Sequence, residues 1–254
     1  MARILIADDN PVTRMVLIAS IEGLGHLANG AVDGTAALAR ACSVGYDLLL
    51  LDLHMPGAGG EAVLARLRAD AMAASRQAPA IATSAELAPT TAEALCRSGF
   101  ADALHKPIPL ARLEAAVNRI LGAPGPAGSG LPPAPAAITA TSSEVPAGVT
   151  LLDDPRALSS AGSASNVAAL RGLFAMELDG LATELTAAFA SGDHPALRDR
   201  LHRLRASCGY CGALALDDAC AGLQRVLDDR ERCAAQLATL LDVAHATRAR
   251  LHGR

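Results

Sequence analysis

The sequence predicts two structural units, a five-stranded parallel α/β sheet with helices on both faces and then an all-α four-helix bundle. In the first half, short apolar runs alternate with longer stretches of helical periodicity, which is typical of a parallel sheet. A segment rich in Pro, Ala, Gly and Ser follows, and beyond it only helical periodicity appears. We therefore expect an α/β domain at 1–122, a linker at 123–148 and a helical domain at 149–254.

The first half gives its expected elements in strict alternation. The expected strands are 3–7, 27–32, 47–51, 80–83 and 101–105, and the expected helices are 11–24, 35–44, 60–70, 90–98 and 110–121. Asn10 and Pro11 fit an N-cap followed by a first-turn proline, so the chain turns into a helix just after Asp8 and Asp9. Pro107 disfavours helical geometry at Lys106 and keeps that residue extended at the tip of the last strand.

The second half gives four expected helices at 166–190, 195–211, 216–227 and 232–251, with a short helix near 154–160 ahead of them. The first of these carries a regular apolar stripe made of Leu170, Leu173, Phe174, Leu178, Leu181, Leu185 and Phe189. Four such helices with short connections predict an antiparallel bundle.

Composition disfavours several classes of protein. A net charge of −4 with only 2% aromatic residues argues against nucleic-acid binding, which needs a basic face. No apolar run reaches the ~18 residues of a membrane span, and the N-terminus turns acidic too early for a signal peptide, so we expect no membrane insertion and a cytoplasmic location. The six cysteines are then expected to be free thiols in packed positions, and the Cys208–Cys211 pair lacks the second pair that a zinc site needs.

One lysine stands out among the 22 basic residues: Lys106 is the only lysine of the chain. Asp8, Asp52, Ser84 and Lys106 all fall at or just past the ends of expected strands, and Asp9 follows Asp8 directly. Ligands of parallel sheets bind at the carboxyl ends of the strands, so we expect these side chains to meet there. The sequence therefore predicts a phosphoryl-accepting site.

The chemistry of that site follows from charge. Three carboxylates that lie together repel one another unless a hard cation joins them, and Mg²⁺ prefers carboxylates with water and phosphate oxygens. Asp8 and Asp9 would hold Mg²⁺, whereas Asp52 would give it one oxygen and attack phosphorus with the other. Lys106 and the Ser84 hydroxyl would meet the remaining phosphoryl oxygens.

Residues 1–122 resemble the receiver domain of two-component response regulators. The motifs are Asp8-Asp9, Asp52 with Met55-Pro56 and Gly60 behind it, Ser84-Ala85 and Lys106-Pro107. The resemblance implies a flavodoxin-like fold, phosphorylation of Asp52, a switch role for the Ser84 hydroxyl and a cis bond before Pro107. Ala103 departs from the pattern, because receivers usually carry Tyr or Phe three residues before the lysine.

In the second half, the stretch 195–211 holds the candidate chemistry. Leu201, Leu204, Cys208 and Cys211 recur at helical spacing and are expected to form the buried seam. His202, Arg205, Ala206 and Gly209 would then share a more exposed face, where small neighbours let another active site approach the imidazole. Arg205, one turn from His202, would stabilise an added phosphoryl group.

Residues from about 149 to 254 resemble the histidine phosphotransfer (HPt) domain. Its motif stands here as His-Arg-Leu-Arg-Ala-Ser at 202–207, with Gly212-Ala213 at the usual distance. The resemblance implies that His202 carries phosphate on a ring nitrogen. Two residues depart from the family pattern: Arg205 replaces lysine, and Ala206 replaces glycine.

Together these features predict a phosphorelay protein that carries phosphoryl groups and has no ATP-binding kinase domain. Its expected partners are a sensor or hybrid histidine kinase and other receiver or HPt domains. Phosphate could enter at Asp52 or at His202, and exchange could occur within one chain or between chains. The alternative is a receiver-only regulator whose helical half is an interaction module. A transcriptional output is disfavoured because the second half has no basic recognition helix.

Overall fold

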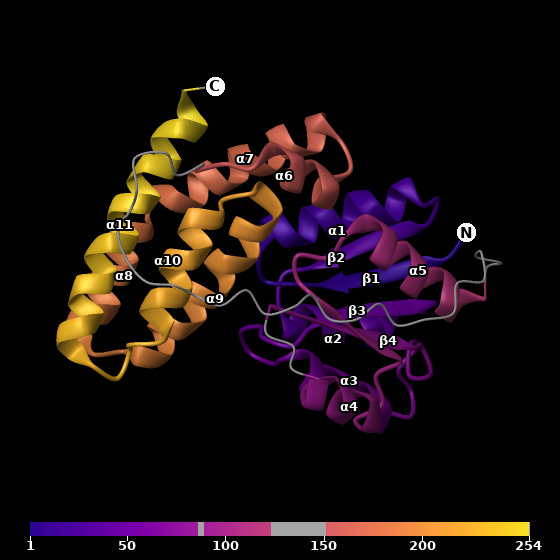
Figure 1. Ribbon diagram of the computed structural model, residues 1–254. Helices are drawn as coiled ribbons and strands as arrows, with labels where there is room; N and C mark the ends of the chain where they lie inside the picture. Colours follow the sequence, from indigo (N-terminus) through magenta and orange to yellow (C-terminus); the bar gives the residue numbers. More distant parts are fainter. Residues whose placement is uncertain (86–88, 123–150, 254) are drawn as a thin grey trace.

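The computed structural model describes residues 1–85, 89–122 and 151–253, and the predicted linker at 123–148 lies outside these ranges. Five parallel strands form a single sheet in the order β2-β1-β3-β4-β5 (Figure 1). The strands are β1 (Arg3–Ala7), β2 (Leu27–Ala31), β3 (Leu48–Asp52), β4 (Ala80–Ser84) and β5 (Asp102–His105). The predicted parallel α/β fold of the first half is therefore confirmed, with strand ends displaced by about one residue, as is usual for boundaries.

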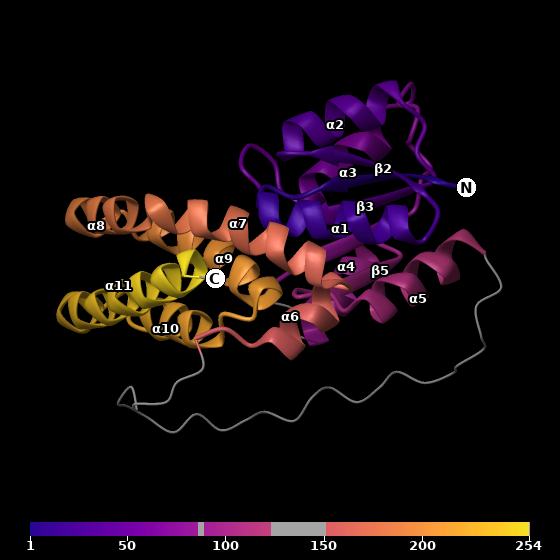
Figure 2. The same ribbon diagram turned by 90° about the horizontal axis from the view of Figure 1, so that it is seen from above.

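Helices cover both faces of this sheet. They are α1 (Pro11–Gly23), α2 (Gly34–Ser43), α3 (Gly60–Ala69), α4 (Pro89–Arg97) and α5 (Leu110–Leu121). Neighbouring strand residues point to opposite faces. Ile4 and Ile6 therefore pack under α1 and α5, whereas Leu5 and Ala7 pack under α2, α3 and α4 (Figures 1 and 2). We refer to residues 1–122 as the α/β half.

Two local features place the helices next to the strand ends. Asn10 caps α1, because its side-chain Oδ1 accepts hydrogen bonds from the backbone N–H groups of Val12 at 2.8 Å and Thr13 at 3.0 Å. Gly60 starts α3 against the end of β3, where a Cβ atom would lie only 2.7 Å from the carbonyl oxygen of Asp52. A glycine is therefore required for α3 to begin so close to Asp52.

Residues 151–253, the helical half, contain six helices. They are α6 (Asp154–Ala161), α7 (Ala164–Asp179), α8 (Leu181–Ser191), α9 (His194–Cys211), α10 (Leu214–Gln224) and α11 (Arg230–His252). The prediction of one uninterrupted helix over 166–190 was wrong, because the chain breaks at Gly180 into α7 and α8. There the Gly180 N–H bonds to the carbonyl of Leu178 instead of continuing the i→i−4 ladder. Glycine is a poor helix former, which fits a break at this point.

The helical bundle itself is confirmed. Its core is built from leucines of α7, α8, α9, α10 and α11 around Phe174 and Tyr210, all nearly inaccessible to solvent. Among the described residues, no helix is both long enough and apolar enough to cross a membrane.

The two halves pack directly on one another. Helix α1 lies against α7 and α9, and α5 contacts α6 (Figure 2). Val12 and Val16 of α1 belong to the same buried apolar cluster as Leu170 and Phe174 of α7. This contact brings the N-terminal end of α1, and with it the strand ends, against α9.

Candidate phosphoryl-transfer site

Three predicted site residues meet at the carboxyl ends of the strands. The Lys106 ammonium lies 2.7 Å from Asp8 Oδ2 and 2.6 Å from Asp52 Oδ2. All three side chains are buried; Lys106 is only 3% exposed. Strands β1 and β3 are neighbours in the sheet, so their C-terminal carboxylates are adjacent, and the long lysine side chain reaches them from the end of β5.

The electrostatics of this cluster are unbalanced toward negative charge. Burial raises the pKa of Asp8 to about 7, although Lys106 opposes that rise. Burial also raises the pKa of Asp9, and the neighbouring Asp52 raises it further. For Lys106, burial by itself would lower the pKa, but the carboxylates of Asp8 and Asp52 outweigh burial and hold the pKa above its usual range.

The three carboxylates fit a divalent cation. Asp8, Asp9 and Asp52 each offer an oxygen, and these three atoms lie within 4.8 Å of one another. The Lys106 ammonium and the Arg203 guanidinium, which lies 3.5 Å from Asp9, together leave one of the three carboxylate charges without a positive partner in this cluster. Carboxylate oxygens beside open space for water are the donor set that Mg²⁺ prefers.

The loop around Lys106 is fixed by its neighbours. The Lys106–Pro107 bond is cis, as the resemblance implied. The Lys106 N–H donates to the carbonyl oxygen of Ser84 at 2.8 Å, which ties the end of β5 to the end of β4. The Ser84 side chain is fully buried at that strand end. The lysine is therefore held by backbone contacts as well as by its carboxylate partners.

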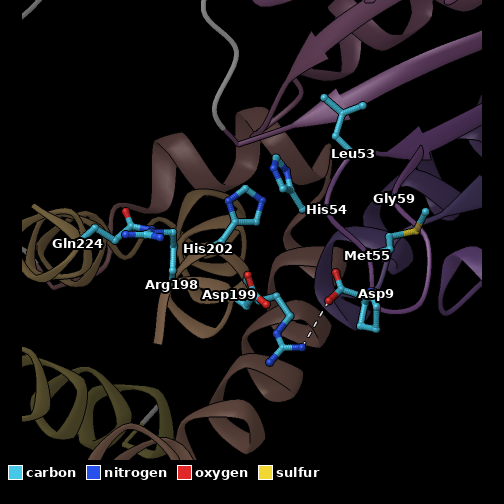
Figure 3. A pocket seen from close by; sticks show the side chains of 11 residues that line it. Asp9, Leu53, His54, Met55, Gly59, Arg198, Asp199, His202 and Gln224 are labelled. Carbon is cyan, nitrogen blue, oxygen red and sulfur yellow. Dashed lines mark ion pairs between the residues drawn. The ribbon is translucent and has the colours of Figure 1, made fainter. Parts of the chain in front are cut away.

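His202 lies on α9 and faces these strand ends. Its ring centroid is 4.6 Å from that of His54, two residues after Asp52, and the planes are tilted by 55°. Both imidazoles line a cavity of about 370 Å³ between the two halves, with Asp9 and Met55 on the α/β side and Arg198 on the helical side (Figure 3). The imidazole of His202 thus points toward the α/β half of its own chain.

The predicted exposed face around His202 needs a correction. Ala206 and Gly209 are buried, and Gly209 lies against Pro107 of the α/β half. A Cβ atom at Gly209 would lie 3.0 Å from the side chain of Pro107, so the two backbones approach closely here. Small residues on this face therefore admit an incoming domain, as the sequence indicated, and the domain they admit is in the same chain.

Arg205 has partners that the sequence did not reveal. Its Nε lies 2.8 Å from Asp217 Oδ1 and its Nη1 donates to Gln224 Oε1 at 3.0 Å, and both partners belong to α10. These contacts join α9 to α10. Its predicted role beside an added phosphoryl group would require the guanidinium to be shared with this ion pair.

Polar contacts across the interface involve residues that the sequence analysis missed or used otherwise. The Asn10 amide donates to the Arg203 carbonyl oxygen at 2.9 Å and to Ser207 Oγ at 2.7 Å. The Ser207 hydroxyl in turn donates to Glu177 Oε2 at 2.5 Å. Asn10 had been identified only as a helix cap; its position directly after the acidic pair was the available signal for a role at the site.

A second set of contacts surrounds the lysine loop and Asp9. The Ile108 N–H donates to the Tyr210 hydroxyl oxygen at 3.0 Å, two residues after Lys106. Burial raises the pKa of this tyrosine above its usual range. Arg203 lies 3.5 Å from Asp9 Oδ2 as an ion pair (dashed in Figure 3). No periodicity in the sequence marks Tyr210 or His54 as interface residues.

The cysteines are all free thiols. Cys208, Cys211, Cys220 and Cys233 are buried, as expected, whereas Cys96 is exposed, which corrects the expectation that every thiol is packed. Burial raises the pKa of both Cys208 and Cys211, so these thiols stay protonated. Within the described part of the chain, the groups able to hold a metal contain carboxylates and histidines only.

Comparison with known families agrees with this arrangement. The family model for the response regulator receiver domain matches residues 4–118, and the Hpt domain model matches residues 169–251. The chain joins a receiver domain to an Hpt domain. The α/β half is accordingly the receiver domain below, and the helical half is the Hpt domain.

Relatives with the same two domains in series are much longer. The chain is 30% identical over 227 residues to the sensor protein GacS of Pseudomonas syringae pv. syringae, covering 89% of this chain and 24% of the relative. It is 28% identical over 250 residues to the sensor histidine kinase GacS of Pseudomonas protegens, covering 96% of this chain and 26% of the relative. The chain therefore spans about a quarter of the length of these curated relatives.

Among solved structures, one match is the receiver domain of a sensor histidine kinase of Pseudomonas aeruginosa PAO1, described with a magnesium ion coordinated in its active site cleft. It has 30% identity and a TM-score of 0.44, and covers 48% of this chain and 98% of that chain.

Proposed function

We propose that this protein relays phosphoryl groups between Asp52 of the receiver domain and His202 of the Hpt domain. The single observation that carries the proposal is the position of His202, whose ring lies beside that of His54 and offers a nitrogen within 4.8 Å of a carboxylate oxygen of Asp52. A histidine without a role in transfer would not be expected to face the carboxylates at the strand ends of another domain across a shared cavity. Its location on α9, opposite the strand ends, is what transfer requires.

Each residue has a defined task in the proposed transfer. A carboxylate oxygen of Asp52 attacks phosphorus of a phosphohistidine donor, the P–O bond forms, and the P–N bond breaks with its electron pair leaving on the donor nitrogen. In the next step a ring nitrogen of His202 attacks the same phosphorus, and the Asp52 oxygen leaves as carboxylate. Lys106 would meet one phosphoryl oxygen and the Ser84 hydroxyl another.

Asp8, Asp9 and Asp52 would hold Mg²⁺, which, when bound, neutralises charge on the phosphoryl oxygens. Neighbouring basic residues hold these three carboxylates in position. Arg203 holds Asp9 through an ion pair, and Lys106 fixes Asp8 and Asp52. Removal of divalent cations with a chelator is expected to abolish phosphate incorporation at Asp52 and leave the fold intact.

We further propose that the receiver and Hpt domains are the units predicted at 1–122 and 149–254, joined by the segment at 123–148. A sensor or hybrid histidine kinase would supply the phosphoryl group in the cytoplasm, where ATP is available. The relatives named GacS, which contain matching segments, support a partner of this class. Other receiver or HPt domains would accept what the chain passes on.

The test is phosphorylation of the chain of residues 1–254 by a purified histidine kinase with labelled ATP. Aspartyl phosphate is lost in base and histidyl phosphate in acid, so the two carriers can be read separately. Asp52→Asn is expected to remove the base-labile label, and His202→Gln to remove the acid-labile label. His245→Gln, on the exposed side of α11, is the matched control and should leave both labels unchanged.

Mixing variants tests whether transfer occurs within one chain. In the wild-type protein, transfer from Asp52 to His202 should proceed at a rate independent of protein concentration. In a mixture of the Asp52→Asn and His202→Gln proteins, label can reach His202 only from another molecule, and its rate should rise with concentration. An acid-labile label that persists in His202→Gln would refute the assignment of His202.

A further inference from the structure

A second group of metal-ligating side chains lies across the domain interface. Asp52, His54 and His202 each offer one ligand atom, and these atoms all lie within 4.8 Å of one another. Neither histidine belongs to the group of Asp8, Asp9 and Asp52 that would hold Mg²⁺, and His54 does not take part in the proposed transfer. The group combines one carboxylate with two imidazoles that come from different domains.

The contacts between the domains hold these donors together. His54 follows β3, which ends at Asp52, whereas His202 is carried by α9. Helix α9 is fixed on the receiver domain by the hydrogen bond from the Asn10 amide to the carbonyl oxygen of Arg203, the residue after His202. The rings therefore approach to 4.6 Å in an arrangement that the backbone supports, which reduces the entropy cost of gathering three ligands.

The donor set favours a different ion from the one expected at the acidic cluster. Three carboxylates and water suit Mg²⁺, whereas imidazole nitrogens with one carboxylate are a common Zn²⁺ set that leaves a fourth position for water. Lys106 contacts Asp52 Oδ2, while Asp52 Oδ1 accepts a hydrogen bond from the His54 backbone N–H at 3.3 Å. The cavity of about 370 Å³ leaves room for water and gives an ion access from solvent.

We propose that Asp52, His54 and His202 bind one Zn²⁺ ion at the interface of the receiver and Hpt domains. The ion would connect the domains and occupy both an oxygen of Asp52 and a nitrogen of His202. If those two residues exchange phosphate as proposed above, bound Zn²⁺ stops the exchange, because a His202 nitrogen whose electron pair is held by the ion cannot attack phosphorus on Asp52. Zinc would then be a reversible inhibitor of transfer within the chain.

The binding test titrates Zn²⁺ into the chain of residues 1–254 and measures binding by calorimetry. Excess Mg²⁺ is present throughout. Wild-type protein should bind one Zn²⁺ per chain. His54→Gln should bind at least about tenfold more weakly, because a direct ligand is lost. His54 is exposed, so this variant is expected to fold. His245→Gln and Cys96→Ser, which remove an exposed imidazole and an exposed thiol elsewhere, should bind as wild type does.

Equal Zn²⁺ affinity in wild type and His54→Gln would overturn the proposal, as would a loss of affinity in Cys96→Ser. The inhibition is tested separately, as the ratio of transfer rates with and without Zn²⁺ for each protein. Zinc should lower this ratio for wild type and much less for His54→Gln. Calorimetry needs no phosphate, so a failure of zinc binding and a failure of the phosphorelay are read in different experiments.

Discussion

Replacement of Tyr210 by phenylalanine tests whether the two domains are held together by the contacts in the structure. The Tyr210 hydroxyl is the acceptor for the Ile108 N–H, at 3.0 Å, and both residues are buried in the interface. The substitution removes only the oxygen and keeps the ring. In the docked protein the Ile108 N–H then has no acceptor there, whereas in the undocked protein water can satisfy it.

The magnitude follows from that difference. Leaving a buried donor without its acceptor costs about 1–3 kcal/mol of docking free energy. Phenylalanine offsets a part of this cost because it buries no hydroxyl group. A net cost of about 1–2 kcal/mol falls on the docked state alone. It lowers the docking equilibrium constant roughly 5- to 30-fold, since each 1.36 kcal/mol is a factor of ten.

The Ile108 amide is itself the reporter. Hydrogen–deuterium exchange of a peptide that contains Ile108 should become faster in Tyr210→Phe, by up to the same factor where domain separation controls exchange. Transfer from Asp52 to His202 within one chain should slow when only the docked form transfers. Tyr46→Phe removes the hydroxyl of the chain's other tyrosine, which is buried in the receiver core, and serves as the matched control.

Unchanged exchange at Ile108 in Tyr210→Phe would show that this hydrogen bond does not hold the domains together. Faster exchange that is equal in Tyr46→Phe would show a general loss of stability instead. Only a response confined to Tyr210→Phe agrees with the docked arrangement described above.

Two further substitutions test the stability of each domain, with thermal or urea unfolding as the measurement. Gly34→Ala should destabilise the receiver domain by several kcal/mol, since the added Cβ would lie 1.9 Å from a backbone carbonyl oxygen. Gly23→Ala is the control: its added Cβ meets nothing within 4 Å, so it should change stability by less than about 1 kcal/mol. Arg200→Ala should destabilise the Hpt domain by about 3 kcal/mol, because Glu177, whose Oε1 lies 2.8 Å from Nη1, loses its positively charged partner inside the bundle. Arg198→Ala on the exposed side of the same helix should cost less than about 0.5 kcal/mol, and equal effects of the two arginine substitutions would contradict the reasoning.

Much of the fold could be predicted because its signals are local. Alternating strands and helices, the Asn10-Pro11 helix start and the loop glycines after Asp52 are each encoded by a few neighbouring residues. The break at Gly180 was missed because the apolar stripe continues across it from α7 into α8, and periodicity alone does not report an interrupted hydrogen-bond ladder. Strand ends differed by a residue for the same reason, since hydrogen bonding and not hydropathy sets them.

The partners of Arg205 and of Asn10 could not be predicted. Arg205 pairs with Asp217 on the next helix, and the choice depends on how α9 and α10 are rotated against each other. Asn10 contacts Ser207 across 197 residues of sequence, and the Tyr210–Ile108 bond spans 102. A sequence pattern carries no record of such pairs when no repeat or motif connects them.

The sequence by itself indicated the candidate phosphate carriers and placed the acids and the single lysine at strand ends. A parallel sheet brings its carboxyl ends to one edge, so the Asp8–Asp52–Lys106 cluster follows from the order of the elements. Only the tertiary structure decided that α1 of the receiver domain packs on α7 and α9, which brings His202 to that edge and beside His54. Surface complementarity between the two domains fixes this contact, and complementarity exists only in the folded chain.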